Sequence, residues 1–99
     1  MPEVYQNLGL VYYLLRQYDD AIRVFERGIR LKPAMLGARL FLGSSYLAKE
    51  RPQEALPHLQ YAYNNQPNVE SAKYLGMCLN SLRRYDEANK YYRFALNLS

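Results

Sequence analysis

The chain repeats a short residue pattern every 34 positions, and this period limits its fold more than any other feature. The recurring residues are a glycine (Gly9, Gly43, Gly76), an alanine (Ala21, Ala55, Ala88) and a proline (Pro33, Pro67). The third copy is one residue shorter, and the missing residue falls between Pro67 and Leu75. Repeats of this length stack into solenoids in which each unit packs on its neighbours.

Apolar residues recur at helical spacing in six segments, which predicts six helices. We expect helices over residues 3–16, 19–31, 35–48, 53–64, 69–81 and 85–98. The connections are short, so successive helices must run antiparallel. The sequence therefore predicts an all-α fold of three antiparallel helix-turn-helix repeats, about 2–35, 36–68 and 69–99, in one domain over 1–99.

The three glycines fall in the middle of predicted helices, where glycine costs about 1 kcal/mol relative to alanine. This cost is tolerated where two backbones approach closely. We expect each glycine to meet the recurring alanine of its partner helix. Large residues should surround this contact: Tyr12, Phe25, Tyr46, Leu59, Leu79 and Tyr92.

With these residues in place, the chain resembles the tetratricopeptide repeat family over residues 2–99. The first copy of the motif reads Tyr5-x-x-Leu8-Gly9-x-x-Tyr12, then Ala21-x-x-x-Phe25 and Pro33. Four residues depart from the family pattern: Gly28, Arg39, Ala72 and Leu79. The resemblance implies a right-handed α-solenoid, with the first helix of each pair lining a concave groove that binds short peptides or partner helices.

One face of each first helix should line this groove, judged from its phase around the helix. The predicted groove residues are Gln6, Leu10, Tyr13, Leu14, Leu40, Phe41, Ser44, Leu47, Lys73, Tyr74, Met77 and Asn80. The apolar members form a stripe typical of a contact surface. The polar members Gln6, Ser44, Lys73 and Asn80 are expected to hydrogen-bond a peptide backbone. In the alternative interpretation, a neighbouring helix covers several of the apolar residues.

Some members of the family hold the terminal carboxylate of chaperone tails with a clamp of basic and amide side chains. The positions that match this clamp are Gln6, Leu10, Phe41, Glu70 and Tyr74. None is Lys or Arg, and Glu70 has the wrong charge for a carboxylate ligand. We therefore expect no chaperone carboxylate-tail binding of this type.

Both ends of the predicted solenoid carry apolar residues where a cap should be polar. Val4, Val11 and Leu15 should face a preceding repeat, and Tyr92, Leu96 and Leu98 should face a following helix. This pattern predicts a fragment of a longer array. The alternative is a three-repeat protein with imperfect caps. In either case, copies are expected to self-associate through the end faces.

The charged residues mostly have a structural explanation. The net charge is +4, with basic residues after the first helix of each pair and acidic residues at the start of the second, which suits the helix dipole. A row of basic turns is compatible with an anionic partner, but we do not expect nucleic acid, because the paired tyrosines fall at core spacing.

No catalytic constellation is present in the sequence. The chain has one histidine, His58, expected to face outward, and one cysteine, Cys78, expected to be a buried inert thiol. We expect neither a metal site nor a cofactor.

No apolar run approaches the ~18 residues that span a bilayer, and the start Met1-Pro2-Glu3 does not resemble a signal sequence, which favours the cytoplasm. The leading hypothesis is a non-enzymatic protein-interaction module. The alternative is a structural scaffold segment that self-associates.

Overall fold

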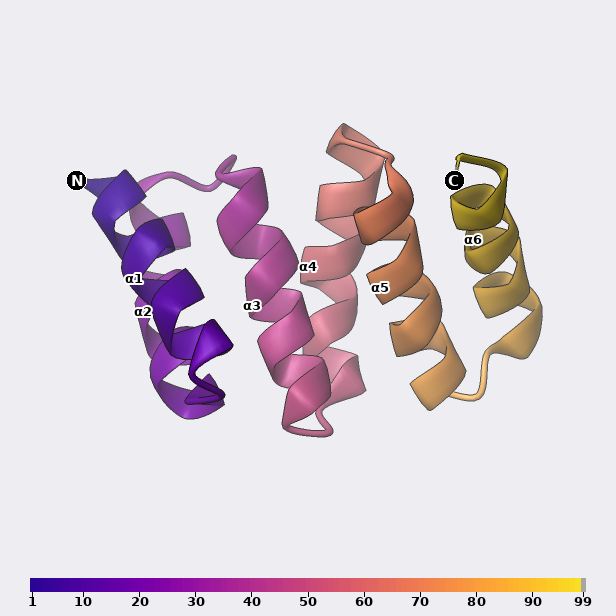
Figure 1. Ribbon diagram of the computed structural model, residues 1–99, viewed down its shortest axis with the longest axis horizontal. Coiled ribbons are helices and arrows are strands. Elements are labelled where there is room, and N and C mark those ends of the chain that lie inside the picture. The colour runs from indigo at the N-terminus through magenta and orange to yellow at the C-terminus, as the bar shows by residue number, and fades with distance from the viewer. Residues whose placement is uncertain (99) are drawn as a thin grey trace.

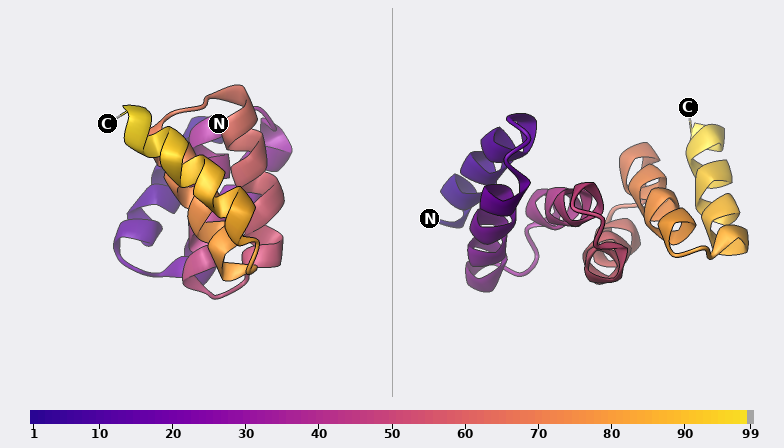
Figure 2. Two further views of the ribbon diagram at one scale, coloured as in Figure 1. Left: turned by 90° about the vertical axis from the view of Figure 1, so that its right-hand side faces the viewer. Right: turned by 90° about the horizontal axis from the view of Figure 1, so that it is seen from below.

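The computed structural model describes residues 1–98, which form six α-helices and no strand. The helices are α1 (Pro2–Leu14), α2 (Tyr18–Leu31), α3 (Leu36–Ala48), α4 (Pro52–Asn65), α5 (Val69–Ser81) and α6 (Tyr85–Leu98). They form three hairpins that follow one another along the 38 Å long axis (Figures 1 and 2). The predicted all-α solenoid is therefore confirmed, and the helix ends differ from expectation by at most two residues.

The same backbone turn closes the first helix of every repeat. In the first repeat, Arg16 adopts a left-handed φ of 61°. Its N–H donates to the Tyr13 carbonyl at 3.0 Å, and the Gln17 N–H donates to the Tyr12 carbonyl at 2.8 Å. This pair of hydrogen bonds satisfies carbonyls at the helix end and stops α1 before residue 16. Glu50 (φ 59°) and Arg83 (φ 61°) occupy the equivalent positions in the other repeats.

The connection before α5 differs from those before α2, α3 and α4 by a side-chain cap. The Ser71 N–H donates to Asn68 Oδ1 at 2.9 Å, and the Asn68 N–H donates to Ser71 Oγ at 3.0 Å. This capping box satisfies two backbone donors that would otherwise lack partners. It lies in the stretch where the third repeat is one residue short.

The mid-helix glycines make room for large side chains of the partner helix, and at Gly43 the recurring Ala55 also lies close, as the sequence suggested. A methyl group on Gly9 would lie 2.5 Å from Phe25 Cε1. The equivalent distances are 2.5 Å for Gly43 to Leu59 Cγ and 2.9 Å for Gly76 to Tyr92 Cδ1. The prediction of a close helix approach holds: the Ala55 carbonyl oxygen would lie 3.4 Å from a methyl group on Gly43, and the atoms nearest to all three glycines belong to the large residues. It also follows that Tyr92 packs inside its own repeat.

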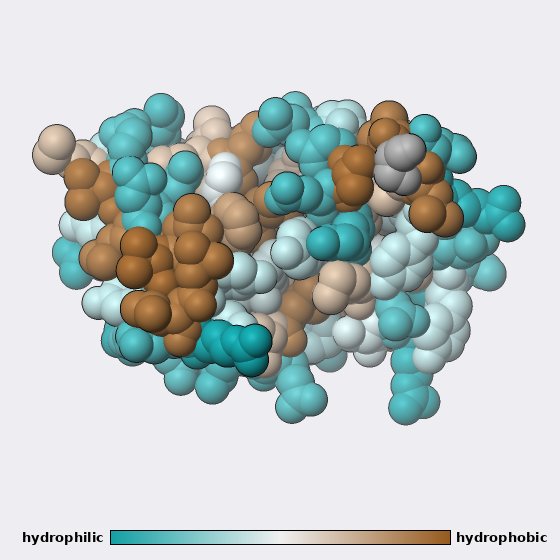
Figure 3. All heavy atoms as spheres, in the orientation of Figure 1, coloured by the Kyte–Doolittle hydropathy of each residue, from teal (hydrophilic) through white to brown (hydrophobic). Residues whose placement is uncertain are grey.

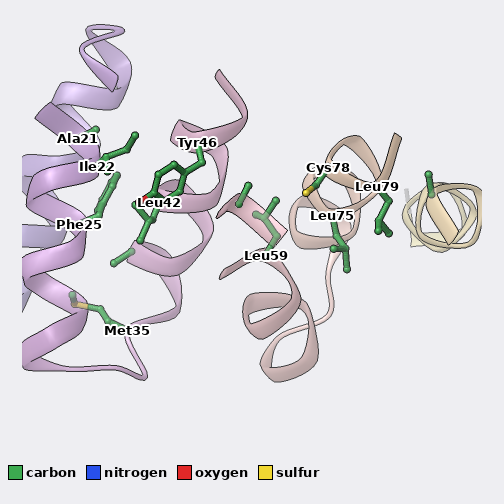
Figure 4. Packing of buried hydrophobic residues seen from close by; sticks show 13 residues of the cluster. Ala21, Ile22, Phe25, Met35, Leu42, Tyr46, Leu59, Leu75, Cys78 and Leu79 are labelled. Carbon is green, nitrogen blue, oxygen red and sulfur yellow. The ribbon is translucent and has the colours of Figure 1, made fainter. Parts of the chain in front are cut away.

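A continuous apolar core runs through all three repeats (Figure 4). Phe25, Leu42, Leu59 and Leu75, one from each of four successive helices, are fully buried. Cys78 is buried as expected, and its Sγ lies 3.2 Å from the Pro52 carbonyl oxygen, to which it donates. Burial raises the pKa of the Cys78 thiol to about 11, so it stays protonated and unreactive at neutral pH.

Candidate protein-binding groove

The predicted groove residues lie on three helices that are neighbours in space. α1 contacts α3, and α3 contacts α5, although a second helix separates each pair in sequence. In Figure 1, α1 and α3 lie in front of α2 and α4. The fold therefore brings these twelve residues onto one layer of the molecule.

Aromatic rings from all three helices meet in this layer. The ring centroids of Tyr13 in α1 and Phe41 in α3 are 5.2 Å apart. Burial raises the pKa of Tyr13 to about 12, and the neighbouring Tyr74 hydroxyl of α5 adds to the rise. Lys73 Nζ lies 4.8 Å from the centroid of the Tyr74 ring, a cation–π contact. These three rings form one aromatic cluster within the predicted groove, which we call the aromatic floor.

Several groove residues remain open to solvent above this floor. Leu14 is 71% exposed and Met77 is 41% exposed, and Lys73 and Asn80 are also exposed. The half-buried members are Gln6, Leu10, Tyr13, Leu40, Phe41, Leu47 and Tyr74. Figure 3 shows a large hydrophobic patch over the α1 end of this face. An exposed apolar patch of this kind is typical of a contact surface.

Ser44 must be removed from the set of residues that can reach a ligand. It is only 4% exposed, and its hydroxyl donates to the Leu40 carbonyl at 3.0 Å. The reason is its place on α3, the middle first helix, which has α1 on one side and α5 on the other. Gln6 is partly covered too, because its Nε2 lies 3.0 Å from the place where Gly37 would carry a methyl group.

A cleft lies at one edge of the groove layer, where α3 and α5 end. It has a volume of about 300 Å³ and is lined by Leu47, Glu50, Pro52 and Ser81. Leu47 is the predicted groove residue that borders it. This cleft offers an apolar side chain and a carboxylate to any partner that extends past the helix ends.

The structure also reveals a polar cluster between α3 and α4 that the sequence did not predict. His58 does not face outward as expected, because its ring stacks on Tyr46 with centroids 6.1 Å apart. Arg39 Nη1 lies 3.2 Å from His58 Nδ1. Burial, followed by the Arg39 charge, lowers the pKa of His58, so the ring is neutral at pH 7 and Nδ1 accepts from Arg39.

Arg39 was visible in the sequence only as a departure from the family pattern, and the structure explains it. Its guanidinium lies 4.4 Å from the Tyr61 ring centroid. In the first repeat, the Arg27 guanidinium lies 5.7 Å from the Tyr5 ring centroid. This contact is equivalent, but there the tyrosine is on the first helix and the arginine is on the second. The cluster therefore stabilises the hairpin and has no place in the groove.

The basic turns are largely neutralised by nearby carboxylates. Arg51 Nη2 lies 2.5 Å from Glu54, and Arg84 Nε lies 2.6 Å from Glu87. Lys49 Nζ lies 3.3 Å from Asp19. These pairs reduce the positive potential along that edge, which weakens the case for an anionic partner.

Within residues 1–98, no group of His, Cys, Asp or Glu side chains is arranged to hold a metal ion. Over the same residues, every helix is too short or too polar to cross a lipid bilayer.

The family model for the tetratricopeptide repeat matches residues 7–70 and again residues 42–97. The chain belongs to the tetratricopeptide repeat family. Two curated relatives extend this finding. The chain is 32% identical over 97 residues to protein O-mannosyl-transferase Tmtc3 of Drosophila melanogaster, and 28% identical over 86 residues to anaphase-promoting complex subunit 7 of Dictyostelium discoideum. The matches cover 96% and 87% of this chain but only 10% and 15% of those proteins.

Solved structures show the same fold at lower sequence identity. MamA from Desulfovibrio magneticus RS-1 superposes with a TM-score of 0.95 and 22% identity, over 100% of this chain and 56% of that one. The first repeat domain of Spaghetti (RPAP3), bound to the HSP90 peptide SRMEEVD, gives a TM-score of 0.92 and 22% identity, over 99% and 79%. These likenesses establish the architecture alone.

Proposed function

We propose that this repeat unit is a non-enzymatic module that binds a peptide or helix of another protein against the α1–α3–α5 layer. The observation that carries the proposal is the pair of exposed apolar side chains, Leu14 on α1 and Met77 on α5, the two helices that contact α3. Membership of the tetratricopeptide repeat family supports it, because such repeats generally mediate protein–protein interaction.

The number of exposed apolar side chains that a partner can bury sets the affinity to expect. Burying an exposed apolar side chain contributes roughly 1.5–3 kcal/mol before the cost of ordering the partner. A few such anchors give a dissociation constant on the order of micromolar, about 8 kcal/mol. The ligand is therefore a segment with apolar side chains spaced to meet Leu14, the aromatic floor and Met77 in turn.

The charges of the layer favour a nearly neutral ligand. Lys73 and Glu70 are both exposed on α5 and carry opposite charges. The Spaghetti domain binds the acidic peptide SRMEEVD, but the clamp positions of this chain hold no Lys or Arg. We expect that peptide to bind this chain no better than a scrambled version of it, with a dissociation constant of millimolar or weaker.

The test uses peptides selected on the intact chain and titrated by calorimetry. The double variant Leu14→Asp, Met77→Asp should weaken binding by about a hundredfold, since two apolar contacts become charged groups facing an apolar ligand. Both residues are exposed, so the helical circular dichroism should be retained. Val11→Asp, on the outer face of α1, is the matched control and should bind the peptide normally. Equal binding by the double variant would refute the groove.

A further inference from the structure

The outer face of α1 corresponds in position to an inner repeat junction. Its apolar stripe consists of Val4, Leu8, Val11 and Leu15, which are between 41% and 59% exposed. The residues 34 positions later than the first three are Ala38, Leu42 and Ser45, and each is 0% exposed in the junction between the first two repeats. The α1 stripe therefore corresponds in position to a buried junction surface, while its own residues are exposed.

A cleft of about 390 Å³ lies at the opposite end of the molecule, between α5 and α6. It is lined by Val69, Lys73, Tyr92, Ala95 and Leu96. Figure 2 shows that α1 and α6 lie at opposite ends of the long axis. Four of the five lining residues are apolar, and Lys73 provides the one charge.

The corresponding position is filled at the junction between the first two repeats. Gly76 follows Gly9 by 67 residues, so the first-repeat counterparts of Ala95 and Lys73 are Gly28 and Gln6. There, Met35 Cε lies 3.0 Å from the place of a methyl group on Gly28, and Met35 is only 7% exposed. Figure 4 shows the Met35 side chain reaching back toward α2 from the connection that precedes α3. An apolar side chain from the second repeat thus fills the space at this junction.

A second methionine occupies the same position in the repeat pattern as Met35. Met1 lies 34 residues before Met35, and both are the N-cap residues of their helices. Met1 is 86% exposed, whereas Met35 is buried. The start of α1 therefore presents the residue type that fills a cleft of this shape.

The charges at the two ends are also complementary. At the inner junction Gly37 lies against the Gln6 side chain, at 3.0 Å from its Nε2. The counterparts of these residues at the two ends are Glu3 and Lys73. Glu3 is the one charged residue within α1. It lies 3.5 Å from Lys32, but this pair is exposed and weak, so the carboxylate can accept a second lysine.

We propose that a second copy of this chain docks head to tail, with its Met1 in the α5–α6 cleft and its Glu3 beside Lys73. The contact joins two different surfaces, so each new copy leaves both kinds of end free, and the association continues as a row of repeats. Pairing of two α1 faces uses neither the cleft nor Lys73, which is why we favour the head-to-tail arrangement.

The fit is looser than at the inner junction. Ala95 carries a methyl group where Gly28 has none, so the flexible end of Met1 must shift by a few tenths of an ångström. Asn89 also replaces the buried Ile22 of the first repeat. We expect reversible association with a dissociation constant on the order of 100 µM, which weakens at high salt.

Sedimentation equilibrium of the whole chain over a wide concentration range provides the main test. Lys73→Glu and Glu3→Lys should each raise the dissociation constant by about tenfold, because like charges then meet. An equimolar mixture of the two variants should recover association, since each junction between unlike variants regains opposite charges and the two variants can alternate along the row. Leu14→Asp, on the groove side of α1, is the control and should leave association unchanged.

Zero-length carbodiimide crosslinking identifies the contact directly. A mixture of ¹⁴N- and ¹⁵N-labelled chains should yield Glu3–Lys73 crosslinks between differently labelled copies. A monomer at millimolar concentration overturns the proposal. So does an association that Val11→Asp abolishes but Lys73→Glu leaves intact, because that result assigns the contact to two α1 faces.

Discussion

α1 and α3 occupy the same place in their repeats, yet their outer faces have opposite surroundings. Leu8 on α1 is 41% exposed, whereas Leu42, its counterpart on α3, is fully buried. The exposed face is also the more apolar of the two, since Val4 and Val11 on α1 correspond to Ala38 and Ser45 on α3. A solvent-facing cap normally shows the reverse pattern. The comparison indicates that the α1 face is suited to being covered.

The largest expected effect comes from a matched pair of leucine-to-alanine substitutions, one on each helix. Leu42→Ala should lower the free energy of unfolding by about 2–5 kcal/mol, because it leaves a cavity in the core. Leu8→Ala should cost less than about 1.5 kcal/mol, since part of the side chain is already in water. Urea unfolding at low micromolar concentration measures both. Equal costs would mean that the α1 face is covered even in dilute solution.

A second pair of substitutions compares the middle repeat with the third repeat. Gly43→Ala places a methyl group 2.5 Å from the buried Leu59, and this overpacking should cost about 1–3 kcal/mol in unfolding free energy. Gly76→Ala meets the Tyr92 ring at 2.9 Å, but Tyr92 is half exposed and can move. The expected cost there is below about 1 kcal/mol, because alanine favours the helix. Thermal unfolding of both variants checks the order, and the reverse order would contradict it.

The smallest expected effect concerns His58, which is present in the second hairpin and replaced by Val24 in the first. The pKa of His58 is lowered in the folded state, so its contribution to stability is present above its ordinary value of 6.5 and is lost as the pH falls through the lowered value. Unfolding free energy should therefore decrease below pH 6.5. His58→Val, which copies Val24 of the first repeat, should remove this part of the pH dependence. An unchanged pH profile in the variant would exclude His58 as its source.

The helices were predictable because their signals are local. Apolar spacing and the prolines placed all six within two residues. The features that were not predicted lie where several helices meet. The burial of Ser44 depends on α3 being flanked by α1 and α5, which helical phase alone does not reveal. The pairing of Gly43 with Leu59 depends on the angle between two helices, and the left-handed Glu50 carries no glycine signal.

Among the described residues, helices contact only others of the same or the adjacent repeat. A pulling force applied across the 38 Å length therefore passes through the two repeat junctions in series, with no element to share the load. Under tension, such a chain yields one hairpin at a time and re-forms in the same steps. The first and third hairpins can therefore move apart without breaking any direct contact between them.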